Sequence, residues 1–110
     1  PLIIFGAMGA SPAHHAVLEG AGARIELVAR DGDGADLMAV LTRLSDLGIG
    51  RVLSEGGGML AASLIAARAV DRLEWFRAPI VLGAQGRPAI GAVQLSQLAE
   101  APRWRRVTVR

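Results

Sequence analysis

The chain has 110 residues, of which 52% are hydrophobic and none is cysteine. This length supports one hydrophobic core, and the lack of cysteine excludes disulfides, thiolate nucleophiles and cysteine-ligated zinc within the chain. The net charge is +2 and every basic residue is arginine, but the arginines cluster only near the C-terminal end, which argues against a nucleic-acid surface. No apolar run reaches the roughly 18 residues that a membrane helix needs.

The first third of the chain predicts a strand, a helix and a second strand. The apolar run at residues 2–5 ends at a glycine and is typical of a buried strand. Ser11 and Pro12 form a helix start, because a serine hydroxyl can accept an unpaired N–H and a proline has no N–H to lose. This helix should reach about Glu19, and residues 24–29 should form the next strand.

The middle of the chain repeats this order. After a glycine-rich turn at residues 31–34, Asp36 is placed to cap a helix whose apolar residues recur at helical spacing as far as Leu47. Residues 51–54 predict a third strand, and a third helix is expected over about residues 59–69. Because strands joined by crossover helices lie parallel in one sheet, this order predicts a mainly parallel sheet.

The last third predicts two strands with no helix between them. Residues 72–82 suit a longer strand, although Pro79 cannot donate to a ladder and must bend the strand or lie at an edge. A glycine-rich loop at 83–91 follows, then a helical turn at 95–98 and a closing strand at 103–110. The sequence therefore predicts an α/β fold with a mainly parallel sheet and an antiparallel edge.

The strongest local motif joins the third predicted strand to the third predicted helix. The strand leads through Glu55 into Gly56, Gly57 and Gly58, and the helix follows at once. Glycine has no Cβ, so its backbone N–H groups can approach a ligand closely. The helix N-terminus adds a partial positive charge and unpaired donors. The motif suits a phosphate cradle, and equally a tight turn that needs glycine for its own geometry.

Glu55 stands at the carboxyl end of its predicted strand, where open α/β sheets bind ligands. A carboxylate would repel a phosphate, so Glu55 is better suited to accept hydrogen bonds from hydroxyls or amines of a neighbouring substrate. The alternative is an exposed or capping carboxylate without a ligand.

Residues 51–91 resemble the reductase domain of riboflavin biosynthesis. The family pattern has EGG after a hydrophobic strand, a helix that ends in Val-Asp, then APxxLG and a glycine-rich loop with GxP. The matching residues are Glu55, Gly56, Gly57, Leu60, Ala61, Leu64, Val70, Asp71, Ala78, Pro79, Leu82, Gly83, Arg87, Pro88 and Gly91. The closing LxxLAEAPRWRRVTVR also fits. The resemblance implies a dihydrofolate-reductase-like, three-layer α/β/α fold.

The resemblance also implies an NADPH-dependent enzyme that reduces the ribosyl group of 5-amino-6-(5-phosphoribosylamino)uracil to a ribityl group. The family's substrate-contacting glutamate falls on Glu55. Its NADPH-binding segment falls on Gly57, Gly58, Met59, Leu60, Ala61, Ala62 and Ser63. Two departures affect this segment. The family commonly has proline at the position of Gly58. It often has threonine at the position of Met59, and methionine offers no hydroxyl to a phosphate. No general acid and no metal site are identified.

Three other places carry weaker signals. His14 and His15 are about 100° apart on a helix, so they do not share a face for metal binding, and a solvated pair is expected. Arg30 follows a strand and is either a surface residue or a partner for the 2′-phosphate of NADPH. Trp75 and Phe76 point to opposite faces of their predicted strand, which predicts one in the core and the other at a subunit interface.

The chain starts without methionine and holds no zinc-deaminase signature. We therefore expect residues 1–110 to be the C-terminal, NADPH-binding portion of a cytoplasmic reductase domain, incomplete and inactive as an isolated piece. The expected partners are the pyrimidine substrate and a second copy in a homodimer, without nucleic acid or membrane. The alternatives are another dihydrofolate-reductase-like NADPH reductase, or a non-catalytic dinucleotide-binding or dimerisation module.

Overall fold

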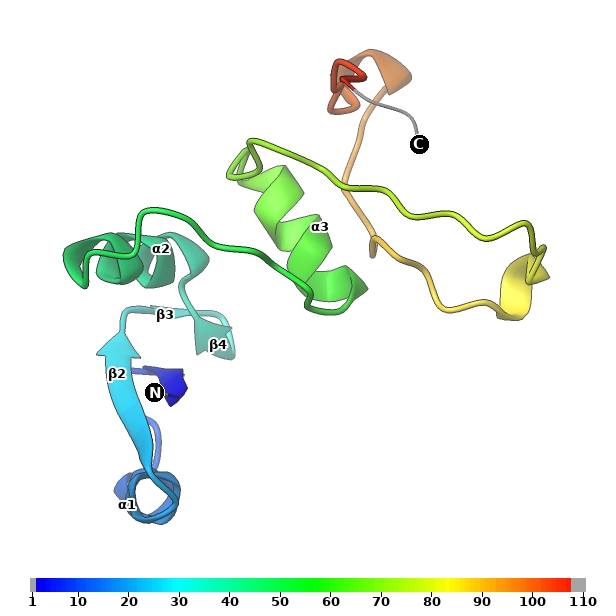
Figure 1. Cartoon of the computed structure of the whole chain (residues 1–110). Coiled ribbons are helices and arrows are strands. Elements are labelled where there is room, and N and C mark those ends of the chain that lie inside the picture. The colour runs from blue at the N-terminus through cyan, green and yellow to red at the C-terminus, as the bar shows by residue number, and fades with distance from the viewer. Residues whose placement is uncertain (1, 108–110) are drawn as a thin grey trace. The chain divides into compact units, whose positions relative to one another are not determined.

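A computed structural model describes residues 2–107 (Figure 1). The chain divides into two compact units, Pro1–Leu53 and Ser54–Arg110. The elements of the first unit are β1 (Leu2–Ala7), α1 (Pro12–Gly20), β2 (Ala23–Val28), β3 (Arg30–Asp31), β4 (Gly34–Ala35) and α2 (Leu37–Asp46). The second unit contains α3 (Gly58–Ala66) and two short 3₁₀ turns, Gly83–Gln85 and Leu98–Glu100.

The first unit is built on a β1–α1–β2 crossover. The two strands pair in parallel, with Leu2 opposite Ala23 and Ala7 opposite Val28, which confirms both predicted strands and the predicted parallel pairing. The helix between them begins at Pro12 as expected, although the side chain of the N-cap Ser11 makes no capping hydrogen bond.

A short hairpin and a capped helix complete this unit. The turn predicted at residues 31–34 is the tip of an antiparallel pair, β3–β4. The antiparallel edge was predicted between residues 72–82 and 103–110, where the described residues form no strands. Asp36 caps α2 as predicted, because its Oδ1 accepts the N–H of Ala39 at 2.7 Å. The helix ends where Gly48 takes a φ of +80° and Ile49 N–H bonds back to Leu44 O at 2.9 Å.

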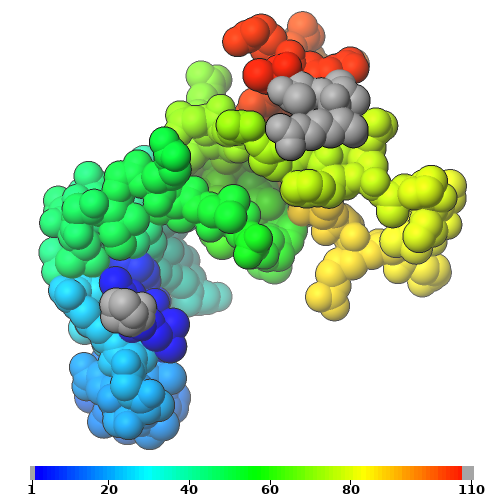
Figure 2. All heavy atoms as spheres, viewed as in Figure 1, coloured from blue at the N-terminus to red at the C-terminus, as the bar shows by residue number. Residues whose placement is uncertain are grey.

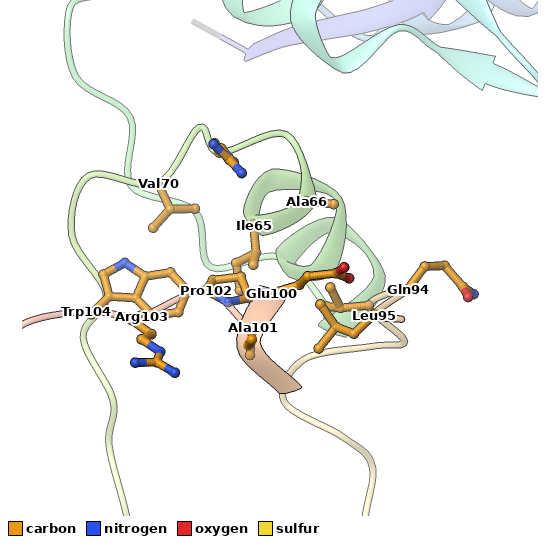
Figure 3. Close-up of a pocket in the computed structure, with 13 residues that line it drawn as sticks. Ile65, Ala66, Val70, Gln94, Leu95, Glu100, Ala101, Pro102, Arg103 and Trp104 are labelled. Atoms are coloured by element: carbon orange, nitrogen blue, oxygen red, sulfur yellow. The ribbon is translucent and has the colours of Figure 1, made fainter. Parts of the chain in front are cut away.

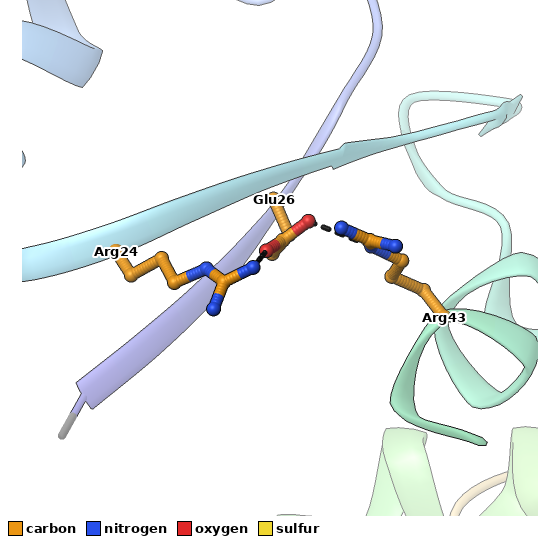
Figure 4. Close-up of polar contacts among 3 residues, drawn as sticks. All are labelled: Arg24, Glu26 and Arg43. Carbon is orange, nitrogen blue, oxygen red and sulfur yellow. Dashed lines mark hydrogen bonds and ion pairs between the residues drawn. The ribbon is translucent and has the colours of Figure 1, made fainter. Parts of the chain in front are cut away.

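The carboxylate of Glu26 lies between two guanidinium groups (Figure 4). Glu26 is a buried residue of β2, and Arg43 of α2 donates its Nε–H to Oε2 at 2.7 Å. Arg24, on the same face of the strand, pairs with Oε1. These bonds, that of Arg43 above all, lower the pKa of Glu26. The pair with Arg43 therefore ties α2 to the sheet.

We expect Glu26→Gln to destabilise the protein at neutral pH, by an amount that shrinks in acid. A carboxylate with a lowered folded pKa stabilises the fold above its unfolded pKa, here 4.5, and this contribution is lost as the pH falls through the lower folded value. Urea unfolding at about pH 7 and about pH 3 measures the difference. Asp33→Asn, an exposed change in the β3–β4 turn, is the control. If the free energies of unfolding of the Glu26→Gln variant and of the wild type differ by the same amount at both pH values, this role is contradicted.

The second unit is organised around α3. Ala62 and Ile65 of this helix are buried. The helix was predicted to reach about residue 69 but ends at Ala66, because Arg68 adopts a φ of +54° and Ala69 N–H bonds back to Leu64 O at 3.0 Å. This is the same kind of ending that α2 makes with Gly48, here made without glycine.

The prediction of strands at 51–54, 72–82 and 103–110 is wrong wherever the structure describes these segments, because they take no strand conformation. Residues 108–110 lie outside the described part of the chain. Trp75 and Phe76 are 56% and 93% exposed, so the prediction that one of them lies in the core is also wrong. Figure 2 shows the segment around residue 80 (yellow) uncovered at the surface. A strand needs a hydrogen-bonded neighbour, and these segments have none among residues 2–107. The predicted turn at 95–98 forms later, at Leu98–Glu100.

Within residues 2–107, no helix has both the length and the apolar character needed to cross a membrane. The described residues form a mixed α/β architecture, with one parallel pair and one antiparallel pair of strands.

Candidate functional site

The glycine turn forms the N-terminus of α3. Gly57 is the N-cap, with φ −66° and ψ 172°, and Ala61 N–H makes the first helical bond to Gly57 O at 3.1 Å. The N–H groups of Gly58, Met59 and Leu60 therefore have no acceptor within the helix. The cap has no side chain and the first turn has no acidic residue. The result is a set of three free donors at the positive end of a helix.

The two glycines at this turn face different surroundings. A Cβ at Gly58 would lie 2.8 Å from Pro88 O and 3.1 Å from Gly91 N, so packing requires glycine there. A Cβ at Gly57 would meet nothing within 4 Å, and its backbone angles suit any residue. Nothing within the described chain explains the glycine at 57, whose open side leaves room for a ligand.

The glycine-rich loop at residues 86–91 lies against the first turn of α3. Gly91 N–H donates to Gly58 O at 2.8 Å, and a Cβ at Gly91 would lie 3.1 Å from the same oxygen. In Figure 1 the chain runs out from α3 to the turn near residue 84 (yellow) and returns to the helix at this contact. The backbone-to-backbone contact fixes the loop beside the free donors.

Glu55 is exposed and lies two residues before the N-cap. Among residues 2–107 it takes part in no ion pair. Its carboxylate is therefore available at the edge of the glycine turn.

The rest of the predicted NADPH-binding segment continues along α3. Met59 is largely exposed and Leu60 partly so, whereas the side chain of Ala62 is buried. The hydroxyl of Ser63 donates to Met59 O at 3.1 Å, so it is turned onto its own helix. Any contact made by this segment would thus come mainly from the backbone of its first residues.

The other candidate residues lie in the first unit. Arg30 is exposed, and its Nε–H donates to Met8 O at 3.3 Å. His14 is exposed, but His15 is half-buried, with Nε2 3.7 Å from the position of a Cβ on Gly6 of β1. Only one of the two histidines is thus fully solvated. Among the described residues, no three His, Cys, Asp or Glu side chains gather as metal ligands would.

A cavity of about 710 Å³ that the sequence did not predict lies at the opposite, C-terminal end of α3 (Figure 3). Ile65 and Val70 line it from the helix end, and Arg103 and Trp104 from the final segment. Glu100 also lines it, but its carboxylate accepts hydrogen bonds from Ser96 N–H and Gln97 Nε2, which lower its pKa. That glutamate therefore caps the local turn. The sequence carries no signal for this cavity, because the early end of α3 that opens it was not predicted.

Comparison with curated proteins and with solved structures gave no match. The family model described as the RibD C-terminal domain matches residues 2–110, which span both units and the whole glycine turn. Members of this family have a dihydrofolate-reductase-like fold and are generally NADPH-dependent. The chain therefore belongs to the RibD C-terminal domain family, the reductase domain of riboflavin biosynthesis.

Proposed function

We propose that this chain is the C-terminal, NADPH-binding portion of a reductase that converts the ribosyl group of 5-amino-6-(5-phosphoribosylamino)uracil to a ribityl group. Family membership supports a pyrimidine reductase of riboflavin biosynthesis. The observation that carries the NADPH assignment is the start of α3, where three free N–H groups adjoin the open side of Gly57.

The residues present fit a dinucleotide. The N–H groups of Gly58, Met59 and Leu60 would hold the pyrophosphate, since anions bind at helix N-termini through such donors. Gly57 lets the phosphate approach the backbone, because a Cβ there would occupy space that is now open. Methionine at 59 brings no hydroxyl, so binding depends on the backbone and on the helix dipole.

Glu55 would hold the substrate by accepting hydrogen bonds from its ribose hydroxyls. When bound, NADPH would supply a hydride to C1′ of the ring-opened, imine form of the substrate, and a water proton would complete the amine nitrogen. The carboxylate of Glu55 would hold the sugar in place for hydride transfer, and this positioning would be its contribution to the rate.

The proposal includes the complete three-layer α/β/α fold of the family and a cytoplasmic homodimer. In such a fold, segments 51–54 and 72–82 gain strand partners. The exposure of Leu53, Trp75 and Phe76 supports this, because large apolar side chains gain free energy when covered.

The test is an assay of the whole protein with NADPH and the pyrimidine substrate. We expect NADPH oxidation that depends on the substrate, and a product that mass spectrometry shows to carry two added hydrogens. NADPH binding without reduction of this pyrimidine would favour a related reductase with another substrate. The absence of any dinucleotide binding would favour a dimerisation module.

A further inference from the structure

We propose that Arg87 is a cofactor-binding residue that pairs with the pyrophosphate of the dinucleotide at the start of α3. This inference rests on the proposed NADPH site and adds a cationic side chain to a cradle otherwise made of backbone groups. It assigns a binding role to the loop at residues 86–91.

The contact between Gly58 and Gly91 places this loop. Gly91 N–H donates to Gly58 O at 2.8 Å, and Pro88 O lies 2.8 Å from the position of a Cβ on Gly58. Two backbones approach this closely only where neither residue has a side chain. Arg87 immediately precedes Pro88, so its backbone is close in sequence to both residues, Pro88 and Gly91, that contact Gly58. Its side chain therefore starts one residue before the carbonyl that meets Gly58 at the first turn of α3.

Arg87 forms no ion pair or side-chain hydrogen bond among residues 2–107, so its charge is available to a ligand. It is the only charged residue of the loop, its side chain is exposed, and it forms no ion pair, whereas Arg24, Arg43 and Arg72 each pair with a glutamate. Guanidinium groups suit phosphates because they donate two parallel hydrogen bonds. An unpaired arginine next to three backbone donors fits a diphosphate better than a neutral ligand.

The loop contacts the helical turn that would hold the pyrophosphate. We therefore expect Arg87 to pair with the pyrophosphate and not with the 2′-phosphate. A residue that binds this group affects NADPH and NADH alike, because both carry it. A residue that binds the 2′-phosphate affects NADPH alone. The two cofactors therefore distinguish the two sites for Arg87.

The test is direct titration of the whole protein with NADPH and with NADH, followed by calorimetry or fluorescence. Arg87→Ala should weaken both by a similar factor, about tenfold to a hundredfold, as expected for loss of a charged hydrogen bond. Arg87→Lys should recover part of the loss. Arg103→Ala is the matched control, because Arg103 lines the cavity at the opposite end of α3, and it should bind as wild type does. A loss confined to NADPH, or no loss, would overturn the proposal.

Gly91→Ala separates the placement of the loop from the charge itself. Its Cβ would press on Gly58 O at 3.1 Å and shift the loop. We expect weaker binding of both cofactors, and little further loss when Arg87→Ala is added, since the arginine is already displaced. Additive losses would show that the glycine contact does not place Arg87. If wild type binds neither cofactor, the proposed function itself fails, which is a result distinct from failure of Arg87.

Discussion

Glu55→Gln is expected to lower kcat for the pyrimidine substrate by about tenfold to a hundredfold, the cost of losing a charged hydrogen bond in the transition state. The Kd for NADPH should stay the same or fall slightly, because the change removes a negative charge two residues before the N-cap of the phosphate-binding turn. The variant keeps the shape of the side chain but removes its charge and replaces one acceptor oxygen with a donor NH₂ group, so the result tests the carboxylate as an acceptor.

Steady-state kinetics and direct NADPH titration on the same preparation measure the two effects. Glu74→Gln is the control, since Glu74 is exposed and paired only with Arg72. Equal losses of turnover and of NADPH affinity would place Glu55 in the cofactor site and contradict its role toward the substrate.

Gly57→Ser is expected to weaken NADPH binding by about tenfold or more without destabilising the protein. Serine is a favoured N-cap, stabilising by a few tenths of a kcal/mol (about 0.3) over glycine. The backbone of Gly57 is already extended and a Cβ there meets nothing within 4 Å. The new hydroxyl would accept the N–H of Met59 or Leu60 and fill the open side. It would thus compete with the phosphate for the same donors.

Gly58→Ala is the matched comparison at the next position. Its Cβ would lie 2.8 Å from Pro88 O, so the loop must shift, at a cost of about 1–3 kcal/mol in the free energy of unfolding. Thermal unfolding and NADPH titration of both variants separate the two glycines. A stable Gly57→Ser variant that binds NADPH as wild type does would show that the open side of Gly57 does not face the cofactor.

Local signals predicted β1, α1, β2, α2 and the start of α3, but not the short strands β3 and β4. Pro12, Asp36 and Gly48 act through neighbours a few residues away, so their effects can be read from the sequence. The segments 51–54 and 72–82 show the limit of this reading. Their composition suits strands, but a strand also needs a hydrogen-bonded neighbour, and no local pattern supplies one. The end of α3 at Arg68 was missed because it uses a left-handed residue that is not glycine.

The glycine turn before α3 was predicted from the sequence, but its inner geometry was not. Three consecutive glycines marked the turn, yet the sequence could not show that Gly58 packs against Gly91 while Gly57 remains open. That distinction depends on a loop about thirty residues further along the chain. The role inferred for Arg87 and the cavity at the far end of α3 depend on the same kind of long-range contact.

Amide hydrogen exchange with and without NADPH tests most directly whether the N-terminus of α3 binds the pyrophosphate of NADPH. We predict slower exchange at Gly58, Met59 and Leu60 when NADPH is bound, because their N–H groups then donate to phosphate oxygens. We predict no change around the cavity at the other end of the helix, near Arg103 and Trp104. Protection confined to that cavity, with the three amides unchanged, would contradict it.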